Sequence, residues 1–436
     1  MSHIWQDHYD IGTYMSYITY PYEVSHKHKY CDDCINMLCR RNLSVWSVLT
    51  LVFIFQCFRC LNTCMFSRYT ACQLHTSVCS STLVIPSLYR GSSVALCVCV
   101  CVCVGMLVLK VVLVLLCVSL VCSEIRHLTD QWITWKSQHK KTYRNTEEEL
   151  YRKSVWEKNL QDVLKHNEET AIGLHTYTLG LNHLSDMTVD EVNPSLNGLM
   201  EEDFYDVNVT FTPPTHPHLP LPHRVNWTER GAVSPIQNQG PCGSCWAFSA
   251  AGALEAQMKM RTGVLVALSA QNLLDCSVSL GNRGCRGGYL SRAFLYIIQN
   301  NGIDSNNFYP YEHKQGLCRY SVTGRGGFCS AFRILPRHDE AALQLTVANV
   351  GPVSVGVNAK LASFHRYRGG IYNDPKCSFG LINHAVLVVG YGSEHGQDYW
   401  LVKNSWGTAW GENGFIRIAR NKNMCGISSF SIYPTI

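Results

Sequence analysis

The most informative stretch of the chain is QGPCGSCWAFS, residues Gln239–Ser249. Ala, Leu, Glu and Met dominate the segment Trp246–Met260, and Gly263 is a suitable C-cap. We therefore predict a helix that begins next to Cys245. A thiol at a helix N-terminus lies near the positive end of the helix dipole, which favours the thiolate and lowers the thiol pKa. Cys245 is thus a candidate nucleophile.

A nucleophilic thiol also needs a base and a group that orients the base. Later segments offer both: His384 precedes an apolar run, and Asn404 lies in KNSWG, 139 and 159 residues after Cys245. A redox site is the alternative, because Cys242 and Cys245 have the Cys-x-x-Cys spacing of thioredoxins. A thioredoxin motif follows an early strand of a small domain, whereas this one lies in a much larger unit. We therefore favour nucleophilic catalysis.

With this signature and these spacings, the chain from about Glu124 to Ile436 resembles a papain-like cysteine protease of the cathepsin L-like subfamily, with its propeptide. The resemblance implies an α+β fold of two domains, a mostly helical left domain and a right domain built on an antiparallel β-barrel, preceded by a helical inhibitory propeptide. Local patterns agree, because helix formers dominate Cys245–Asn300. Apolar, β-rich segments bounded by Gly or Asn predict strands at Val353–Val357, Ala385–Gly390, Tyr399–Lys403 and Phe415–Ile418.

The resemblance also implies catalytic roles. Cys245 is the nucleophile, and His384 is the base that forms a thiolate–imidazolium couple with it. Asn404 bonds to the far imidazole nitrogen and holds the ring, and Trp406 shields that bond from water. The amide of Gln239 and the Cys245 backbone N–H form the oxyanion hole. No cofactor and no metal are implied.

Substrate recognition follows from the same comparison. Gly287 and Gly288 offer backbone to an extended peptide, since glycine allows another backbone to approach closely. The implied S2 pocket is apolar and uncharged, so we expect Leu or Val at P2. It is lined by Tyr289, Leu290, Gly356, Ile382, Ala385 and Phe430. Ala385 stands where the most similar sequences usually have glycine, and its methyl group narrows this pocket. The implied substrate-binding set is Trp246, Gly287, Gly288, Tyr289, Leu290, Gly356, Ile382, Ala385, Trp406 and Phe430.

Cysteine usage indicates an oxidising compartment, since 22 cysteines are too many for a reducing one unless they bind metal. Eight of them lie between residues 242 and 425. Sequence alone does not fix their pairing. The resemblance pairs Cys242 with Cys285, Cys276 with Cys318, and Cys377 with Cys425. It leaves Cys329 as a free thiol.

We predict four parts: a doubtful N-terminal extension (1–105), a signal peptide (106–123), an inhibitory propeptide (124–220) and a papain-like peptidase domain (221–436). The Val-Cys alternation at 98–104 is what a translated GT repeat gives, which makes the extension doubtful. Lys110, the apolar run Val111–Val121 and the small residues after it have signal-peptide character. Two alternatives concern the extension: a zinc site at the Cys-x-x-Cys pairs beginning at Cys31 and Cys57, and a membrane anchor, for which Val94–Val121 is long enough.

In the propeptide, one helical stripe carries chemistry-specific residues at steps of three and four: Glu148, Arg152, Trp156, Asn159, Val163 and Asn167. Together with Gly180, Asn182, Leu184 and Asp186 they resemble the two propeptide motifs of cathepsin L-like proteases. Residues 124–220 look like two helices and a tail. That segment carries a net charge of −7, and residues 221–436 carry +9. Opposite charges suit docking, and protonation of carboxylates in acid weakens it. Asn208 and Asn226 begin glycosylation sequons.

We therefore predict a lysosomal or secreted cysteine endopeptidase, made as a zymogen. The alternative is an inactive homologue that acts as a binding protein or decoy, which the intact Cys245, His384, Asn404 and Gln239 argue against. An exopeptidase of the same fold would need a large insertion between Cys245 and His384. Expected partners are protein and peptide substrates, the chain's own propeptide and cystatin-type inhibitors. Nucleic acid is not expected, since no basic run interleaves with aromatic residues.

Overall fold

The computed structural model describes residues 92–201 and 220–436, with side chains from Val104 onward. The Cys-x-x-Cys pairs of the extension and the Asn208 sequon lie outside the described residues. The chain divides into two units, Met1–Ile133 and Thr134–Ile436.

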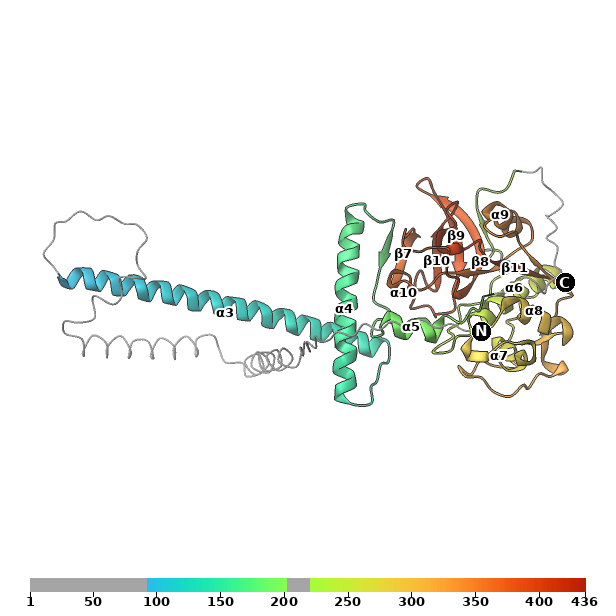
Figure 1. Cartoon of the computed structure of the whole chain (residues 1–436), viewed down its shortest axis with the longest axis horizontal. Helices are drawn as coiled ribbons and strands as arrows, with labels where there is room; N and C mark the ends of the chain where they lie inside the picture. The colour runs from blue at the N-terminus through green and yellow to red at the C-terminus, as the bar shows by residue number, and fades with distance from the viewer. Residues whose placement is uncertain (1–91, 202–219) are drawn as a thin grey trace, which may run out of the picture. The chain divides into compact units, whose positions relative to one another are not determined.

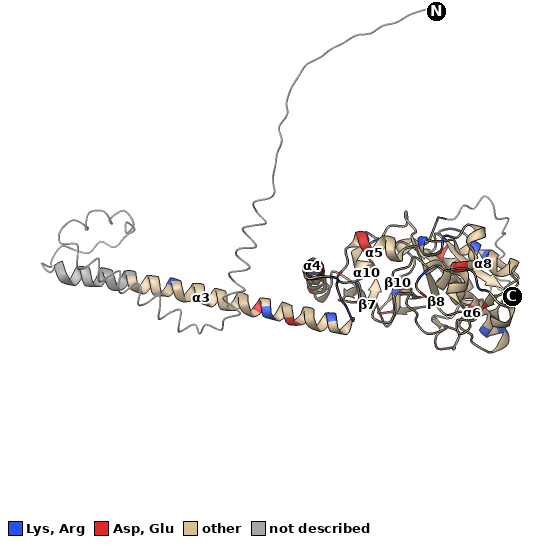
Figure 2. Cartoon of the chain, turned by 90° about the horizontal axis from the view of Figure 1, so that it is seen from below, with Lys and Arg blue, Asp and Glu red and all other residues tan. Residues whose placement is uncertain are grey.

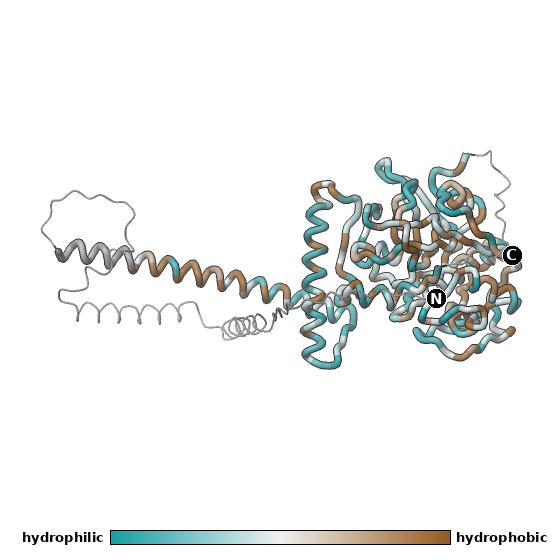
Figure 3. The backbone as a smooth tube through the Cα atoms, viewed as in Figure 1, coloured by the Kyte–Doolittle hydropathy of each residue, from teal (hydrophilic) through white to brown (hydrophobic). Residues whose placement is uncertain are grey.

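The described part of the first unit is one helix, α3 (Ser92–Gln138). Its last residues, 134–138, belong to the second unit in sequence. Its apolar character is visible in Figure 3, and Lys110 is the one charged residue between Val104 and Ser123 (Figure 2). The segment Val104–Gln138 is long and apolar enough to cross a membrane. A signal sequence has the same character, so the signal peptide at 106–123 remains a prediction.

The second unit contains the predicted peptidase part, whose first half is helical (Figure 1). Helix α6 (Cys245–Thr262) begins at the candidate nucleophile and ends at Gly263, whose φ of 76° confirms the predicted left-handed cap. It is buried from Cys245 to Ala256 and packs against the other helices of this half. The remaining elements here are α7 (Ala270–Cys276), η2 (Val278–Leu280), η3 (Gly284–Arg286), α8 (Leu290–Gln299), β3 (Ile303–Asp304), η4 (Val322–Gly324) and β4 (Arg325–Gly327).

The other half is a sheet in the order β1-β7-β10-β9-β8-β6-β11-β5, with β2 paired to β8. Its pairs are antiparallel except β7 with β10. The four predicted strands are confirmed as β6 and as parts of β8, β9 and β10. The bounds of this half are β2 (Val225–Asn226), β5 (Ala331–Ile334), α9 (Glu340–Asn349), β6 (Val353–Val357), α10 (Ala362–His365), β7 (Tyr367–Tyr372), β8 (His384–Glu394), β9 (Gln397–Lys403), β10 (Phe415–Ala419), η5 (Met424–Gly426) and β11 (Ser431–Thr435).

The two halves meet where α6 lies against β8. Small residues permit the close approach: the Ser249 hydroxyl donates to the Val386 carbonyl at 2.8 Å, and a Cβ on Gly252 would lie 3.0 Å from Leu387. Because α6 begins at Cys245 and β8 begins at His384, this packing holds the starts of the two elements together.

Thr134–Glu201, which we call the propeptide segment, differs in part from the predicted two helices and a tail. Besides α3 and α4 (Thr146–Ala171), it forms β1 (Tyr177–Leu179) and α5 (Val189–Leu196). Strand β1 pairs with β7 and extends the peptidase sheet at its edge. Helix α5 begins after the N-cap residue Thr188, which forms a capping box with Glu191 in the first turn.

The predicted stripe on α4 is confirmed as the packing face of that helix. Trp156, Asn159 and Val163 are buried. Asn159 donates to the carbonyls of Ser185 and Met187, at 2.9 and 3.1 Å. These hydrogen bonds therefore hold the second predicted propeptide motif, residues 180–186, against α4.

Candidate active site

The four catalytic candidates come from four separate places in the fold and are all buried, with at most 2% of their surface exposed. Cys245 is the first residue of α6, His384 the first of β8, and Asn404 follows the last residue of β9. The fourth, Gln239, lies in the loop before α6. The fold thus assembles residues that are up to 165 positions apart in the chain.

The imidazole of His384 is held on two sides. Its Nε2 lies 2.8 Å from Asn404 Oδ1, and because a carbonyl oxygen only accepts, Nε2 is the donor. In the neutral ring Nδ1 then carries the lone pair. The ring of Trp406 covers the imidazole, with centroids 4.7 Å apart. A fully buried indole over this contact excludes water from it.

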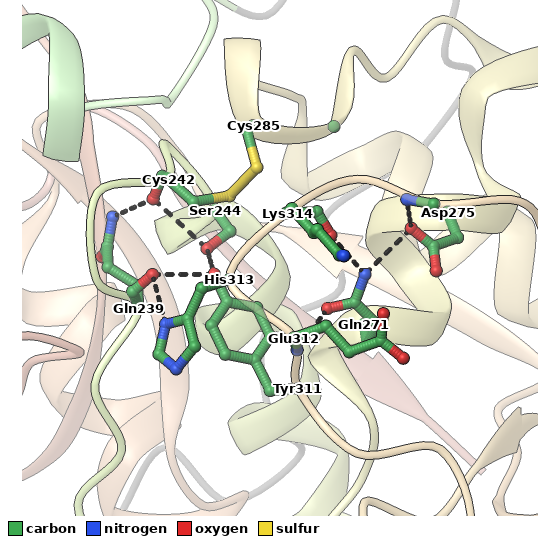
Figure 4. The surroundings of a disulfide bond; sticks show 12 residues. Gln239, Cys242, Ser244, Gln271, Asp275, Cys285, Tyr311, Glu312, His313 and Lys314 are labelled. Atoms are coloured by element: carbon green, nitrogen blue, oxygen red, sulfur yellow. Dashed lines mark hydrogen bonds between the residues drawn. A yellow bond between two sulfur atoms is a disulfide. The ribbon is translucent and has the colours of Figure 1, made fainter.

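The side-chain amide of Gln239 is held by hydrogen bonds. Figure 4 shows the one to the Cys242 carbonyl, beside the Cys242–Cys285 disulfide. Ser405 Oγ donates to its Oε1 at 2.6 Å, so its Nε2 is directed to carbonyl oxygens. One belongs to Cys242, at 2.7 Å, and the other to Leu196 of the propeptide segment, at 2.9 Å. Ser405 carries no sequence signal of this role except its position next to Asn404.

Residues Leu196–Met200, which we call the covering segment, lie over these groups. The Gly198 backbone N lies 3.4 Å from Cys245 Sγ. Backbone hydrogen bonds then run along the segment: Gly288 N to Gly198 O at 2.9 Å, Met200 N to Gly288 O at 3.0 Å, and Leu199 N to Asn383 O at 3.0 Å. Leu199 and Gly288 form a parallel bridge. The propeptide segment thereby occupies the position of an extended peptide.

Two glycines make this approach possible. A Cβ on Gly198 would lie 1.9 Å from the Gly243 carbonyl oxygen, so no side chain fits there. A Cβ on Gly288 would lie 2.6 Å from the ring of Trp246, which backs the bridge from within the helical half.

Some of the predicted substrate-binding residues lie near the covering segment, and others make their contacts elsewhere. A Cβ on Gly356 would lie 2.8 Å from Leu199 Cδ2, and one on Gly287 would lie 2.7 Å from Gly198 O. Leu199 shares a buried apolar cluster with Trp246, Leu290, Ala385 and Phe430, and Ile382 packs against it. Trp406 instead lies on His384. Tyr289 faces Arg292, whose guanidinium lies 4.0 Å from the ring centre.

Burial sets the protonation of the site in this form. It raises the pKa of the Cys245 thiol, although backbone N–H groups that include those of Ala385 and Gly198 oppose the shift. It also lowers the pKa of His384 to about 4, while the hydrogen bond to Asn404 and the nearby Leu196 backbone oppose the shift. In this buried form the shift of the thiol pKa is opposite to the lowering expected from the helix N-terminus, because desolvation dominates. The thiolate–imidazolium couple stays a prediction for the open site.

Three disulfides lie in residues 220–436: Cys242–Cys285, Cys276–Cys318 and Cys377–Cys425. They are the pairs that the resemblance implies. Cys329 is a buried free thiol whose pKa burial raises to about 12. The Asn226 amide donates to Glu229 at 3.0 Å and accepts from Thr228, so it already has protein partners.

Comparisons with known proteins identify the class. Residues 221–435 match the papain family cysteine protease model, and residues 132–192 match the cathepsin propeptide inhibitor domain (I29). The chain belongs to the papain family of cysteine proteases, as a papain-like endopeptidase that carries its own propeptide inhibitor domain.

Individual relatives lie within the cathepsins. The chain is similar to cathepsin S of Bos taurus, 50% identical over 311 residues that cover 71% of this chain and 93% of the relative. It is 45% identical to cathepsin K of Mus musculus, over 73% of this chain and 96% of that one. Among solved structures it resembles digestive procathepsin L2 proteinase from Tenebrio molitor larval midgut, with a TM-score of 0.68 and 40% identity, covering 71% of this chain and all of that one.

Proposed function

We propose that this chain is the latent precursor of a cysteine endopeptidase that uses Cys245, His384, Asn404 and Gln239, and that removal of the propeptide activates it. The observation that carries the proposal is the covering segment. Its backbone lies at once against the thiol of Cys245 and the amide of Gln239, where a scissile peptide would have to lie.

The chemistry follows from the hydrogen bonds of the site. Once the covering segment leaves, His384 Nδ1 accepts the Cys245 proton and the thiolate attacks the substrate carbonyl. Gln239 Nε2 and the Cys245 backbone N–H stabilise the oxyanion, in the position where Gln239 now donates to Leu196 O. The imidazolium then donates the proton to the leaving amine, and water hydrolyses the thioester. Asn404 keeps the ring in one orientation throughout.

Latency has both a steric and an electrostatic part. The covering segment excludes substrate. Burial raises the pKa of the Cys245 thiol in this form, which favours the less nucleophilic thiol. Removal of the covering segment restores access to the thiol.

Leu199 supports the proposed P2 preference. It lies 8% exposed among the residues of the predicted S2 pocket, where its Cδ2 is close to Gly356. A Leu side chain thus fits a pocket without charged lining. We infer a preference for Leu or Val over Phe at P2, since the Ala385 methyl group takes up part of the volume.

The relatives support the setting. Cathepsin S and cathepsin K are similar over nearly their whole length. We infer a lysosomal or secreted location from this likeness and from the disulfides, which persist in oxidising compartments. Cystatin-type inhibitors are the proposed protein partners besides substrates.

The test is activity of the acid-treated precursor on a Leu-P2 peptide, with Cys245→Ser as the control and intact mass to locate the new N-terminus. Turnover that the control lacks, on a fragment starting near Leu221, is the expected result. A correctly trimmed and folded fragment without turnover would overturn the proposal in favour of an inactive homologue.

A further inference from the structure

Two imidazoles and a carboxylate gather outside the candidate active site, in His166, Glu169 and His175. One ligand atom from each lies within 4.8 Å of the others. The two imidazole rings stack, with centroids 4.1 Å apart and planes 6° from parallel, and His175 Nε2 lies 2.9 Å from Glu169 Oε2. We propose that these three side chains bind one zinc ion.

A short piece of sequence builds the cluster. His166 and Glu169 are three residues apart on α4, so they share a face of the helix. The helix ends at Ala171, and Gly173 then adopts a φ of 84°. Its backbone N bonds to the Thr170 carbonyl, and the next residue bonds back to the Glu169 carbonyl. This turn returns the chain over the last turn of α4 and places His175 beside the other two ligands.

The donor set suits zinc. Two imidazole nitrogens and one carboxylate oxygen are a known zinc ligand set that leaves a fourth position for water. Tetrahedral zinc with bonds of about 2.1 Å holds its ligand atoms about 3.4 Å apart and lies in the plane of each imidazole, so one of the two stacked rings must turn about its Cβ–Cγ bond to close the cluster. The side chains of His175 and Glu169 are 29% and 36% exposed, which lets an ion enter from solvent. Zinc then takes the place of the proton between these two residues, and in the neutral ring that proton moves to Nδ1 of His175.

The surroundings of His166 already resemble those of a metal ligand. Its Nε2 lies 3.1 Å from the Tyr177 carbonyl oxygen and must donate to it, because a carbonyl only accepts. The neutral ring therefore keeps a lone pair on Nδ1. Ligating histidines commonly donate their other ring N–H to a backbone carbonyl, which fixes the ring and its tautomer.

The position gives the site a consequence. Tyr177 begins β1, the strand that pairs with β7 of the peptidase part. Its ring lies 4.7 Å from that of Tyr372, and its hydroxyl donates to Asp374 at 3.3 Å. Zinc would join the end of α4 to the turn that leads into β1. A bound ion therefore stiffens the attachment of the propeptide segment and slows its release.

The test uses the precursor carrying Cys245→Ser, so that the candidate nucleophile cannot bind the ion. Calorimetric titration with zinc chloride at neutral pH, and the visible spectrum with Co²⁺, count and characterise the sites. We expect a site that Glu169→Gln and His175→Ala each weaken by more than about tenfold. His223→Ala, at an exposed histidine, should bind as the parent does.

A second readout separates binding here from binding elsewhere in the chain. Zinc should slow hydrogen exchange of residues 172–179 in the parent and in His223→Ala, and not in Glu169→Gln. Glu169→Gln preserves the shape of the side chain, so it tests the site even where His175→Ala perturbs the turn. Thermal unfolding without zinc checks that each variant is folded. Zinc affinity unchanged in Glu169→Gln, or exchange in this turn that zinc leaves unaltered, would overturn the proposal.

Discussion

The propeptide segment is held at two places that differ in kind. At the first, which we call the anchor (α4, residues 180–186 and β1), specific side chains make buried contacts. Asn159 Oδ1 accepts from Arg366 of the peptidase part at 2.9 Å, and Asn182 donates to the His365 carbonyl at 2.8 Å. At the second, the covering segment, most hydrogen bonds come from the backbone and one position must lack a side chain; Asn197 adds a side-chain hydrogen bond to the Ala359 carbonyl, at 3.2 Å.

This difference separates the two tasks of the propeptide. The anchor supplies stability, because each buried amide or ion pair would leave an unsatisfied partner if it were lost. Asp186 is an example, since it is buried and takes both Lys141, at 2.7 Å, and Tyr143, at 2.9 Å. We propose that the covering segment supplies inhibition by lying on the candidate catalytic groups. Substitutions should therefore damage folding at the anchor and latency at the covering segment.

The largest effect is expected at the anchor, from Trp156→Ala. Trp156 is fully buried and its ring lies 6.2 Å from that of Trp135, so its loss leaves a large cavity. We expect a loss of about 3–5 kcal/mol in the stability of the propeptide segment. Thermal unfolding of the Cys245→Ser precursor measures it. Leu150→Ala, on the exposed side of the same helix, is the matched control and should cost little. Equal losses in the two variants would contradict the anchor.

Gln239→Ala tests the covering segment from the peptidase side. It removes the amide that now donates to Leu196 O, and the proposed oxyanion donor with it. We expect kcat/KM of the activated enzyme to fall about 10²–10³-fold. Ser405→Ala removes only the group that orients this amide, so its decrease should be smaller. Activity within twofold of the parent in Gln239→Ala would rule out the oxyanion role.

The pH dependence of release follows from His384. Its pKa is about 4 under the covering segment, below the ordinary value of 6.5, so the closed form binds fewer protons in this range. Docking of the covering segment over the site, which we call closure, is therefore most favoured above about pH 6.5. Its equilibrium constant falls as the pH drops from there towards 4, by at most about tenfold per pH unit. Hydrogen exchange of residues 196–200, corrected for intrinsic rates, measures the opening of the Cys245→Ser precursor. His384→Gln should flatten the profile, and an unchanged slope would assign the acid response elsewhere.

Gly198→Ala breaks the covering segment and leaves the anchor intact. The added Cβ would lie 1.9 Å from the Gly243 carbonyl oxygen, which neither backbone can easily avoid. Overpacking of this kind costs about 1–3 kcal/mol, so we expect closure to weaken by roughly ten- to a hundredfold. The rate at which iodoacetamide alkylates Cys245 in the precursor reports the weakened closure. The midpoint of thermal unfolding should stay unaltered, because the anchor on α4 is not changed. Gly380→Ala, at a position with open space and no positive φ, controls for the loss of a glycine.

The contrast between the two places also explains what the sequence could predict. The anchor depends on residue identity at helical spacing, so Trp156, Asn159 and Val163 could be recognised from the sequence alone. The strands and the Gly263 cap were likewise local patterns of hydrophobicity and turn chemistry. The catalytic candidates could be proposed because each lies in a distinctive local motif.

Other features depend on how distant segments meet. Gly198 and Leu199 look like ordinary loop residues, and only the fold brings them against Cys245 and Gly356. The thiol pKa was expected from the helix N-terminus alone, but burial of the thiol in the folded chain reverses the direction of the shift. The cluster around His166 was missed for the same reason, since His175 lies past the helix end and its return depends on the turn at Gly173.

The smallest effect concerns P2 selectivity. Ala385 pairs with Gly356 across β8 and β6, and Gly356 lies close to Leu199, so we expect a methyl group here to border the proposed pocket. Ala385→Gly should raise the ratio of Phe-P2 to Leu-P2 hydrolysis several-fold, because a single methylene-sized change is worth about 1–3 kcal/mol. Ratios of kcat/KM for two matched peptides measure it. In the parent we expect Leu to be preferred; a clear preference for Phe there would show that Leu199 fills the pocket without defining its size.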